Sequence, residues 1–256
     1  MLIVLSPAKS LDYESKLPFK RSTTPRFLDE SEHLVKVMAT KSPDEIGRLM
    51  DLSSDLADLN WHRFQDWDRS MDPKEARPAV LAFKGDTYLG LDVSQWSTRD
   101  FTHAQKNLRI LSGLHGVLRP LDRIHPYRLE MGTKLATEAG KNLYEFWGDS
   151  ITETIAAELE GHSPKVLVNC ASKEYFKAVH PKQLDATVVT PQFLDLNNGG
   201  YKTIGFFAKR ARGAMASWLI RSRAKSLKSV TKFEGLGYRY SEDRSTRSTP
   251  VFLRDH

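Results

Sequence analysis

The chain has 256 residues, of which 40% are hydrophobic and 27% charged, so it can bury a core of one large domain or two small ones. Its apolar start, MLIVLSPAK, is too short for a signal-peptide core, and no run approaches the roughly 20 apolar residues that cross a bilayer. We therefore expect a cytoplasmic protein with no membrane partner, and its single cysteine, Cys170, excludes an internal disulfide framework. The net charge of +6 permits a polyanionic partner without demanding one.

The pattern along the chain alternates between strand-like and helix-like segments. Apolar β-branched runs predict strands, and apolar periodicity with capping residues predicts helices. The expected strands are residues 2–6, 79–83, 87–91, 108–113, 165–169, 185–190, 201–207, 238–241 and 251–253. The expected helices are residues 29–40, 43–67, 97–108, 150–160 and 208–225, with a short one after Ser172. This order predicts a mixed α/β fold, a single compact domain with a mixed sheet flanked by helices.

Residues 42–66 have the layout of a helix-hairpin-helix, with a Ser-Pro-acidic start and a tight turn between two helical segments. In such motifs the free backbone N–H groups of the hairpin and of the second helix hold a DNA phosphate and read no base. The expected contacts are Asp51, Leu52, Ser53 and Ser54. The usual hairpin is rich in glycine, whereas Asp51 and Ser53 stand at those positions here. A plain helical hairpin remains open as the alternative.

A second candidate is the segment between Asp195 and Glu234, which has nine Lys and Arg residues and no acid. Positive charge in the first turns of a helix opposes the helix dipole, so an anion such as phosphate would compensate it. The alternative is a solvated basic face paired with acids elsewhere. The residues that we expect to contact DNA in this segment are Lys209, Arg210, Arg212, Gly213, Arg221 and Arg223.

A third group consists of polar residues in loops beside the predicted strands, where ligand sites of α/β proteins gather. They are Lys9, Asp86, Arg128, Glu130, Asn169, Ser172 and Glu174. If these side chains converge in one cleft, they could supply acid-base or glycosidic chemistry on a nucleoside or a damaged base. Each could equally be a structural hydrogen-bond or ion-pair partner.

Motifs for metals and cofactors are lacking in the sequence. The eight histidines form no HxxxH or HxH pair, and there is no Walker A run and no GxGxxG. We therefore expect no dedicated metal site and no cofactor.

Several stretches, spread in order over nearly the whole chain, resemble the YaaA peroxide-stress family. They are LSPAKSL (5–11), RPAVLAFKGDTYLGLD (77–92), LRILSGLHGVLRPLDRIHPYRLEMGTKL (108–135), LYEFWG (143–148), VNCASKEYF (168–176) and FFAKRARGAMA (206–216). The resemblance implies a bacterial cytosolic protein that aids survival of hydrogen peroxide and is associated with low free iron. It also implies a family-specific fold with a positively charged cleft, a helix-hairpin-helix and DNA binding. Cys170 and His115 depart from the residues usual in the family, a leucine-like residue and an aromatic.

Two functions follow as hypotheses. In the first, the protein is a monomeric, non-enzymatic binder of duplex or structured DNA that contacts the phosphate backbone without reading sequence. In the second, the loop residues form an active site that acts on a base or nucleoside. Convergence of Lys9 with the loop carboxylates in one pocket is the observation that would favour the second.

Overall fold

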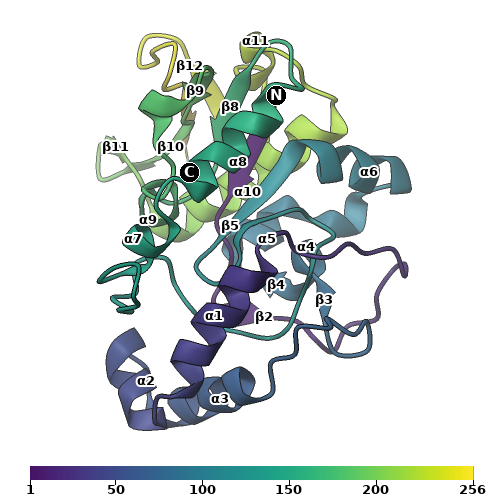
Figure 1. Ribbon diagram of the computed structural model, residues 1–256. Helices are drawn as coiled ribbons and strands as arrows, with labels where there is room; N and C mark the ends of the chain where they lie inside the picture. The colour runs from purple at the N-terminus through teal and green to yellow at the C-terminus, as the bar shows by residue number, and fades with distance from the viewer. Residues whose placement is uncertain (256) are drawn as a thin grey trace.

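The computed structural model describes residues 1–255, which form a mixed α/β protein with two larger sheets (Figure 1). The strands are β1 (Leu2–Leu5), β2 (Ser10–Leu11), β3 (Arg77–Pro78), β4 (Phe83–Lys84), β5 (Leu108–Ser112), β6 (Gly116–Leu118), β7 (Arg123–Ile124), β8 (Val166–Asn169), β9 (Thr187–Val189), β10 (Gln192–Asn197), β11 (Gly200–Lys202), β12 (Arg239–Ser241) and β13 (Val251–Arg254). The helices are α1 (Leu28–Ala39), α2 (Pro43–Met50), α3 (Ser54–Gln65), α4 (Ala79–Ala82), α5 (Asp86–Leu91), α6 (Thr98–Asn107), α7 (Leu143–Trp147), α8 (Ser150–Leu159), α9 (Lys173–Phe176), α10 (Gly205–Arg221) and α11 (Leu227–Val230), with 3-10 turns at Val93–Gln95 and Pro181–Gln183. None of the helices formed by residues 1–255 is both long and apolar enough to cross a bilayer.

The first sheet has the strand order β6-β5-β1-β8-β9. Its strands β5, β1, β8 and β9 run parallel, and β6 is antiparallel to β5. The central strand β1 is buried along its whole length, as expected for a parallel strand that is covered on both faces. From β1 the chain goes on to β5 on one side, whereas β8 goes on to β9 on the other, so β1 and β8 flank a topological switch point. Ligands of open α/β sheets bind beyond the carboxyl ends of the strands at such a point.

The second sheet has the order β11-β10-β13-β12, with β10 and β13 parallel. Its core contains the aromatic cluster of Phe193, Phe233 and Phe252. Helix α10 contacts both β1 of the first sheet and β10 of the second, so it connects the two. In Figure 1 the helices α2 and α3 form the lower end of the molecule, far from the second sheet.

Helix α10 also crosses α5 at very short range. A Cβ atom at Gly213 would lie 1.8 Å from the carbonyl oxygen of Thr87, and one at Gly90 would lie 1.9 Å from that of Arg210. Only glycine fits at both positions, because any side chain would overlap the facing backbone. The close crossing fixes Asp86 at the start of α5 relative to Arg212 on α10.

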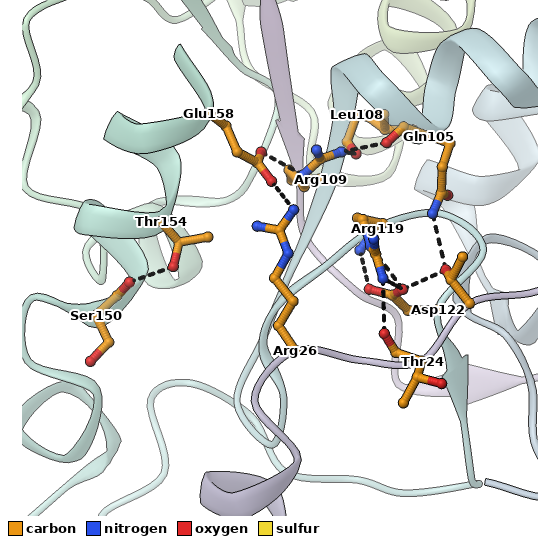
Figure 2. A network of polar contacts seen from close by, with 11 residues as sticks. Thr24, Arg26, Gln105, Leu108, Arg109, Arg119, Asp122, Ser150, Thr154 and Glu158 are labelled. Carbon is orange, nitrogen blue, oxygen red and sulfur yellow. Dashed lines mark hydrogen bonds and ion pairs between the residues drawn. The ribbon is translucent and has the colours of Figure 1, made fainter. Parts of the chain in front are cut away.

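A buried ion-pair network ties the first sheet to its surroundings (Figure 2). Arg109 on β5 is 5% exposed, and its Nε lies 2.6 Å from Oε2 of Glu158 on α8. The other oxygen of Glu158 lies 2.5 Å from Nη2 of Arg26, in the loop before α1. In the same view Asp122, fully buried, accepts hydrogen bonds from the Arg119 side chain.

The predicted elements are largely confirmed, with four corrections. Residues 79–83 and 87–91 are not a pair of strands, because the first forms α4 and β4 and the second forms α5, which packs on α10. Residues 201–207 are a strand only to Lys202, after which α10 begins at Gly205. The helix expected over residues 43–67 is two helices, α2 and α3, separated by a turn at residues 51–53. The single mixed sheet of the prediction is also replaced by two larger sheets and two small ones.

Candidate functional site

A cleft of about 310 Å³ opens at the switch point between β1 and β8. It is lined by residues 6–10 after β1, residues 84–87 at the start of α5, residues 127–130, Cys170, Ser172, Glu174 and Tyr175 after β8, and Lys209 and Arg212 of α10. Loops that lie far apart in the sequence therefore meet at one edge of the parallel sheet, as the topology requires.

Six of the seven loop residues predicted as a catalytic group line this cleft. They are Lys9, Asp86, Arg128, Glu130, Ser172 and Glu174. Asn169 does not line it, and its side chain forms hydrogen bonds beside the cleft instead. Its Oδ1 accepts a hydrogen bond from the N–H of Ala171 at 3.0 Å, and its Nδ2 donates to Oγ1 of Thr190 at 3.3 Å. Asn169 thus shapes the turn that carries Cys170 and Ser172.

The two loops that follow β1 and β8 are joined by a pair of hydroxyl groups. Oγ of Ser6 accepts a hydrogen bond from the N–H of Ser172 at 2.8 Å and donates to Oγ of Ser172 at 3.3 Å. Ser172 also caps α9 by accepting from the N–H of Tyr175. These contacts fix the shape of the cleft between the two strand ends.

The carboxylate of Glu130 is shared by two cations within the cleft. Nζ of Lys9 lies 2.9 Å from Oε1 of Glu130, and Nη2 of Arg128 lies 3.2 Å from the same oxygen. Glu174 is held differently, because its Oε1 accepts from the N–H of Gly132 at 2.9 Å. The carboxylates of Glu130 and Glu174 are therefore held in place within the cleft, and a third carboxylate, that of Asp86, lines it at the start of α5.

The cleft has more positive than negative charge. Five Lys and Arg side chains line it, against three carboxylates. Within residues 1–255, Lys84, Lys209 and Arg212 have no carboxylate within 4 Å. Arg212 is half-buried, and burial lowers the pKa of its guanidinium, which still stays charged at neutral pH. Among residues 1–255 its one hydrogen bond is long, 3.4 Å from Nη1 to the carbonyl oxygen of Ala171.

The inner wall of the cleft is aromatic and apolar. Tyr127, Tyr175 and Cys170 are all buried. Burial raises the pKa of both phenols, and it raises the pKa of the Cys170 thiol to about 12 in spite of the nearby Arg212. The thiol is therefore protonated at neutral pH, and it is the thiolate that acts as a nucleophile, so Cys170 serves as packing here.

The basic residues predicted to contact DNA separate into distinct groups. Lys209 and Arg212 are three residues apart on α10, which puts them on one face, and both line the cleft. Arg210 and Arg221 are exposed outside it. Arg223 is engaged, because its guanidinium pairs with Asp100 at 2.8 Å and donates to the carbonyl of Ile220. Gly213 lies against α5, where a DNA backbone could not approach it.

The predicted helical hairpin forms as α2, a three-residue turn and α3. A capping box of Ser42 and Glu45 starts α2, and Asp51 ends it in the left-handed conformation with φ of 53°. Ser53 is the N-cap of α3, with no side-chain capping bond, and Ser54 is its first residue, while Leu52 is half-buried. The exposed side chains of Asp51 and Asp55 flank the turn. The structure thus shows a helical hairpin, and the charge around its turn is negative.

Sequence reasoning treated the loop residues and the basic helix as separate candidates, and it missed Lys84, Thr87 and Tyr175. The i, i+3 spacing of Lys209 and Arg212 was a signal that could have set them apart from Arg210. Within the described part of the chain, no group of three or more His, Cys, Asp and Glu residues is placed to hold a metal ion.

Comparison with known proteins gives the family. Residues 1–244 match the family described as peroxide stress protein YaaA. The chain is 51% identical to a UPF0246 protein of Alcanivorax borkumensis over 254 residues, which cover 99% of this chain and 98% of that protein. It is 49% identical to a UPF0246 protein of Aliivibrio fischeri over 255 residues, which cover all of this chain and 98% of the relative. The chain therefore belongs to the YaaA peroxide-stress protein family.

Proposed function

We propose that this protein is a cytoplasmic, monomeric DNA-binding protein of the peroxide-stress response, which binds the phosphate backbone without recognising sequence. The observation that supports the proposal most is the positive charge of the cleft, where Lys84, Lys209 and Arg212 have no carboxylate within 4 Å among residues 1–255. Lysine and arginine side chains supply most phosphate contacts in protein–DNA complexes, and such contacts position DNA but read no base.

The surface around the cleft extends this charge. Arg210 and Arg221 on α10 are exposed, with no carboxylate partner in the described residues. A duplex lying along α10 could reach these side chains while one backbone segment faces Lys209 at the mouth of the cleft. The helical hairpin of α2 and α3 is a second proposed contact, through the free N–H groups at the start of α3. The carboxylates of Asp51 and Asp55 oppose that contact, so we assign the larger share of the affinity to the cleft and α10.

The experiment compares the Lys209→Ala/Arg210→Ala double variant, which lacks two exposed cations of α10, with the parent on two duplexes of equal length and unrelated sequence. We expect weaker binding of both duplexes by the same factor, because the lost contacts are to phosphates. The matched control is Arg99→Ala/Lys106→Ala, which removes two exposed cations of α6 that lie outside the cleft. Equal affinities for the parent and the Lys209→Ala/Arg210→Ala variant, or a strong preference for one sequence, would overturn the proposal.

The proposed cellular role is to limit free iron and so protect DNA from peroxide. Iron and peroxide together damage DNA, so binding DNA and limiting iron belong to the same physiology. In a strain that lacks the gene, the parent chain should restore peroxide survival and lower the free iron measured by electron paramagnetic resonance. The Lys209→Ala/Arg210→Ala variant should not restore peroxide survival, whereas the Arg99→Ala/Lys106→Ala control should restore it.

A second candidate function is acid-base chemistry on a nucleobase or nucleoside. It is favoured by the convergence of Lys9, Asp86, Glu130 and Glu174 in one cleft. Carboxylates at fixed places beside a lysine are the groups that general acid-base and glycosidic reactions use. Release of free base from nucleosides or peroxide-damaged DNA, followed by chromatography, tests it. We expect Asp86→Asn or Glu174→Gln to abolish the release, and no release by the parent chain would exclude this candidate.

A further inference from the structure

The cleft is too small to hold a DNA duplex, which is the ligand that the proposed function assigns to the protein. Its volume is about 310 Å³, whereas the major groove of B-DNA alone is about 12 Å wide. A duplex can therefore lie over the mouth but cannot enter. Ligand pockets for small molecules begin at about this volume. The interior of the cleft has room for a molecule of about the size of one nucleotide.

The inner part of the cleft is asymmetric in its chemistry. On one side Arg212 presents a half-buried guanidinium that has no carboxylate partner within residues 1–255. Burying a charge without a partner costs free energy, so a site keeps such a group for a ligand of opposite charge. On the other side are the buried rings of Tyr127 and Tyr175, which offer apolar surface.

The groups around Arg212 match a phosphate monoester. A guanidinium binds phosphate oxygens through two parallel hydrogen bonds, and Lys209 on the same face of α10 adds a second positive charge. The hydroxyl group of Ser172, which accepts from Ser6 and from the N–H of Tyr175, lines the same cleft and can donate its own proton to a further oxygen. A monoester has a charge of about −1.5 to −2 at pH 7, which suits two cations better than the single charge of a diester does.

We propose that the cleft binds one nucleotide by its terminal phosphate, with Arg212 as the anchor and the tyrosine wall against the nucleoside. The inference rests on the proposed function in that it assigns the same positive cleft, but it names a different ligand, a phosphate monoester and not the duplex backbone. Asp86 and Glu174 then accept hydrogen bonds from the sugar hydroxyl or from amino groups of the base. The monoester can come from a free nucleotide or from the 5′-phosphorylated end of a DNA strand.

Calorimetric titration with dAMP, deoxyadenosine and inorganic phosphate tests the inference on the full chain. We expect dAMP to bind, inorganic phosphate to bind more weakly and to compete with it, and deoxyadenosine to bind at least about tenfold more weakly than dAMP, as loss of a charged hydrogen-bonding group predicts. Arg212→Met should raise the dAMP Kd by about tenfold to a hundredfold. The matched control, Arg99→Met, removes an exposed arginine outside the cleft and should leave the Kd unchanged.

A melting curve shows whether Arg212→Met folds. Because the variant removes an uncompensated half-buried charge, its Tm without ligand should equal or exceed that of the parent, and added dAMP should raise the Tm of the parent alone. If the variant does not fold, Arg212→Lys keeps the charge but loses the paired hydrogen bonds, and should still weaken dAMP binding. No binding of dAMP to the parent, or equal binding of dAMP by the parent and either folded variant, would overturn the inference.

Two further titrations separate the sources of the ligand and separate this inference from DNA binding in general. A single-stranded oligonucleotide with a 5′-phosphate, compared with its 5′-hydroxyl form, identifies a strand end as the source if the phosphorylated form binds more tightly. If dAMP binds and the two forms bind equally, the source is a free nucleotide.

A covalently closed circular duplex has no ends, so its binding reports on the proposed function alone. Binding of the circle without binding of dAMP refutes the nucleotide site and leaves the proposed function standing; the reverse result refutes duplex binding and supports the site.

Discussion

Lys9 and Glu130 form an ion pair within the cleft, with 2.9 Å between Nζ and Oε1, and Arg128 shares the same oxygen at 3.2 Å. One carboxylate thus neutralises part of the charge of two cations. Whatever anion enters the cleft competes with Glu130 for Lys9, so this side chain sets how positive the cleft is.

Replacing Glu130 by Gln should therefore tighten binding of phosphate-bearing ligands. The change leaves Lys9 and Arg128 without their shared carboxylate. Two unit charges about 4 Å apart in water interact with a free energy of about 1 kcal/mol, which corresponds to about fivefold in Kd. Anisotropy titration of a labelled duplex measures it, with Glu75→Gln, an exposed carboxylate outside the cleft, as the control. Weaker binding by Glu130→Gln than by Glu75→Gln would show that Glu130 itself holds the ligand.

The network in Figure 2 predicts a large loss of stability on Glu158→Gln. The change leaves Arg109, 5% exposed, without its counter-ion, and breaking a buried pair by removing one partner costs about 3 to 5 kcal/mol. Urea unfolding followed by circular dichroism measures the free energy of unfolding. The double variant Arg109→Met/Glu158→Leu should recover most of the loss, because no buried charge is left unpaired. A loss below about 1 kcal/mol for Glu158→Gln would mean that water reaches Arg109.

The buried histidine predicts a pH dependence of stability. Burial lowers the pKa of His115 to about 3, while Ser31 hydrogen-bonds its Nδ1 at 2.8 Å. The unfolded chain binds a proton near pH 6.5 and the folded chain does not, so stability falls as the pH drops from about 6.5 to about 3, by up to about 1.4 kcal/mol per pH unit. His115→Phe should remove this part of the dependence. The exposed His62→Gln serves as the control. Identical slopes of unfolding free energy against pH for the parent and His115→Phe would mean that His115 is protonated in the fold.

The hairpin is tested by Ser53→Glu. A carboxylate at the N-cap of α3 favours folding by about 0.3 to 1 kcal/mol, because it lies beside free N–H groups at the positive end of the helix dipole. The same carboxylate would repel a DNA phosphate, so duplex affinity should fall although no cation has been removed. Thr98→Glu at the start of α6 adds the same charge to another helix N-terminus and is the control. Equal affinities for the two variants and the parent would refute the hairpin contact and leave the cleft and α10 as the DNA-binding surface.

Much of the fold can be predicted from the sequence where local signals are strong. The apolar run of β1 predicts a buried strand, and Ser97 with Asp100 predicts the capping box that starts α6. The segment of α5 could not be predicted in this way, because it packs closely on α10, which lies more than a hundred residues away in the sequence. Gly90 on α5 and Gly213 on α10 allow this close approach. Tertiary packing decides such short segments, and local propensity does not.

The candidate site, too, could be predicted only in part from the sequence. Polar residues after predicted strands identify Lys9, Ser172 and Glu174 as possible ligand contacts, because parallel strand ends share one edge of a sheet. Arg212 faces these loops, whereas Arg210 faces solvent. The packing of α10 on α5 decides this, because it fixes the orientation of α10 about its own axis. Local sequence patterns do not determine that orientation, so the sequence alone could not predict that the basic helix and the loop residues share one cleft.

If duplex DNA is bound through its phosphates at the mouth of the cleft and along α10, its affinity depends steeply on the salt concentration. With 4 to 6 phosphates neutralised, the logarithm of the binding constant should fall with the logarithm of the salt concentration with a slope of about −4 to −5. Removing two contacts in Lys209→Ala/Arg210→Ala should reduce the steepness of the slope by about 2. A slope near zero for the parent, or the same slope for the parent and this variant, would contradict the account.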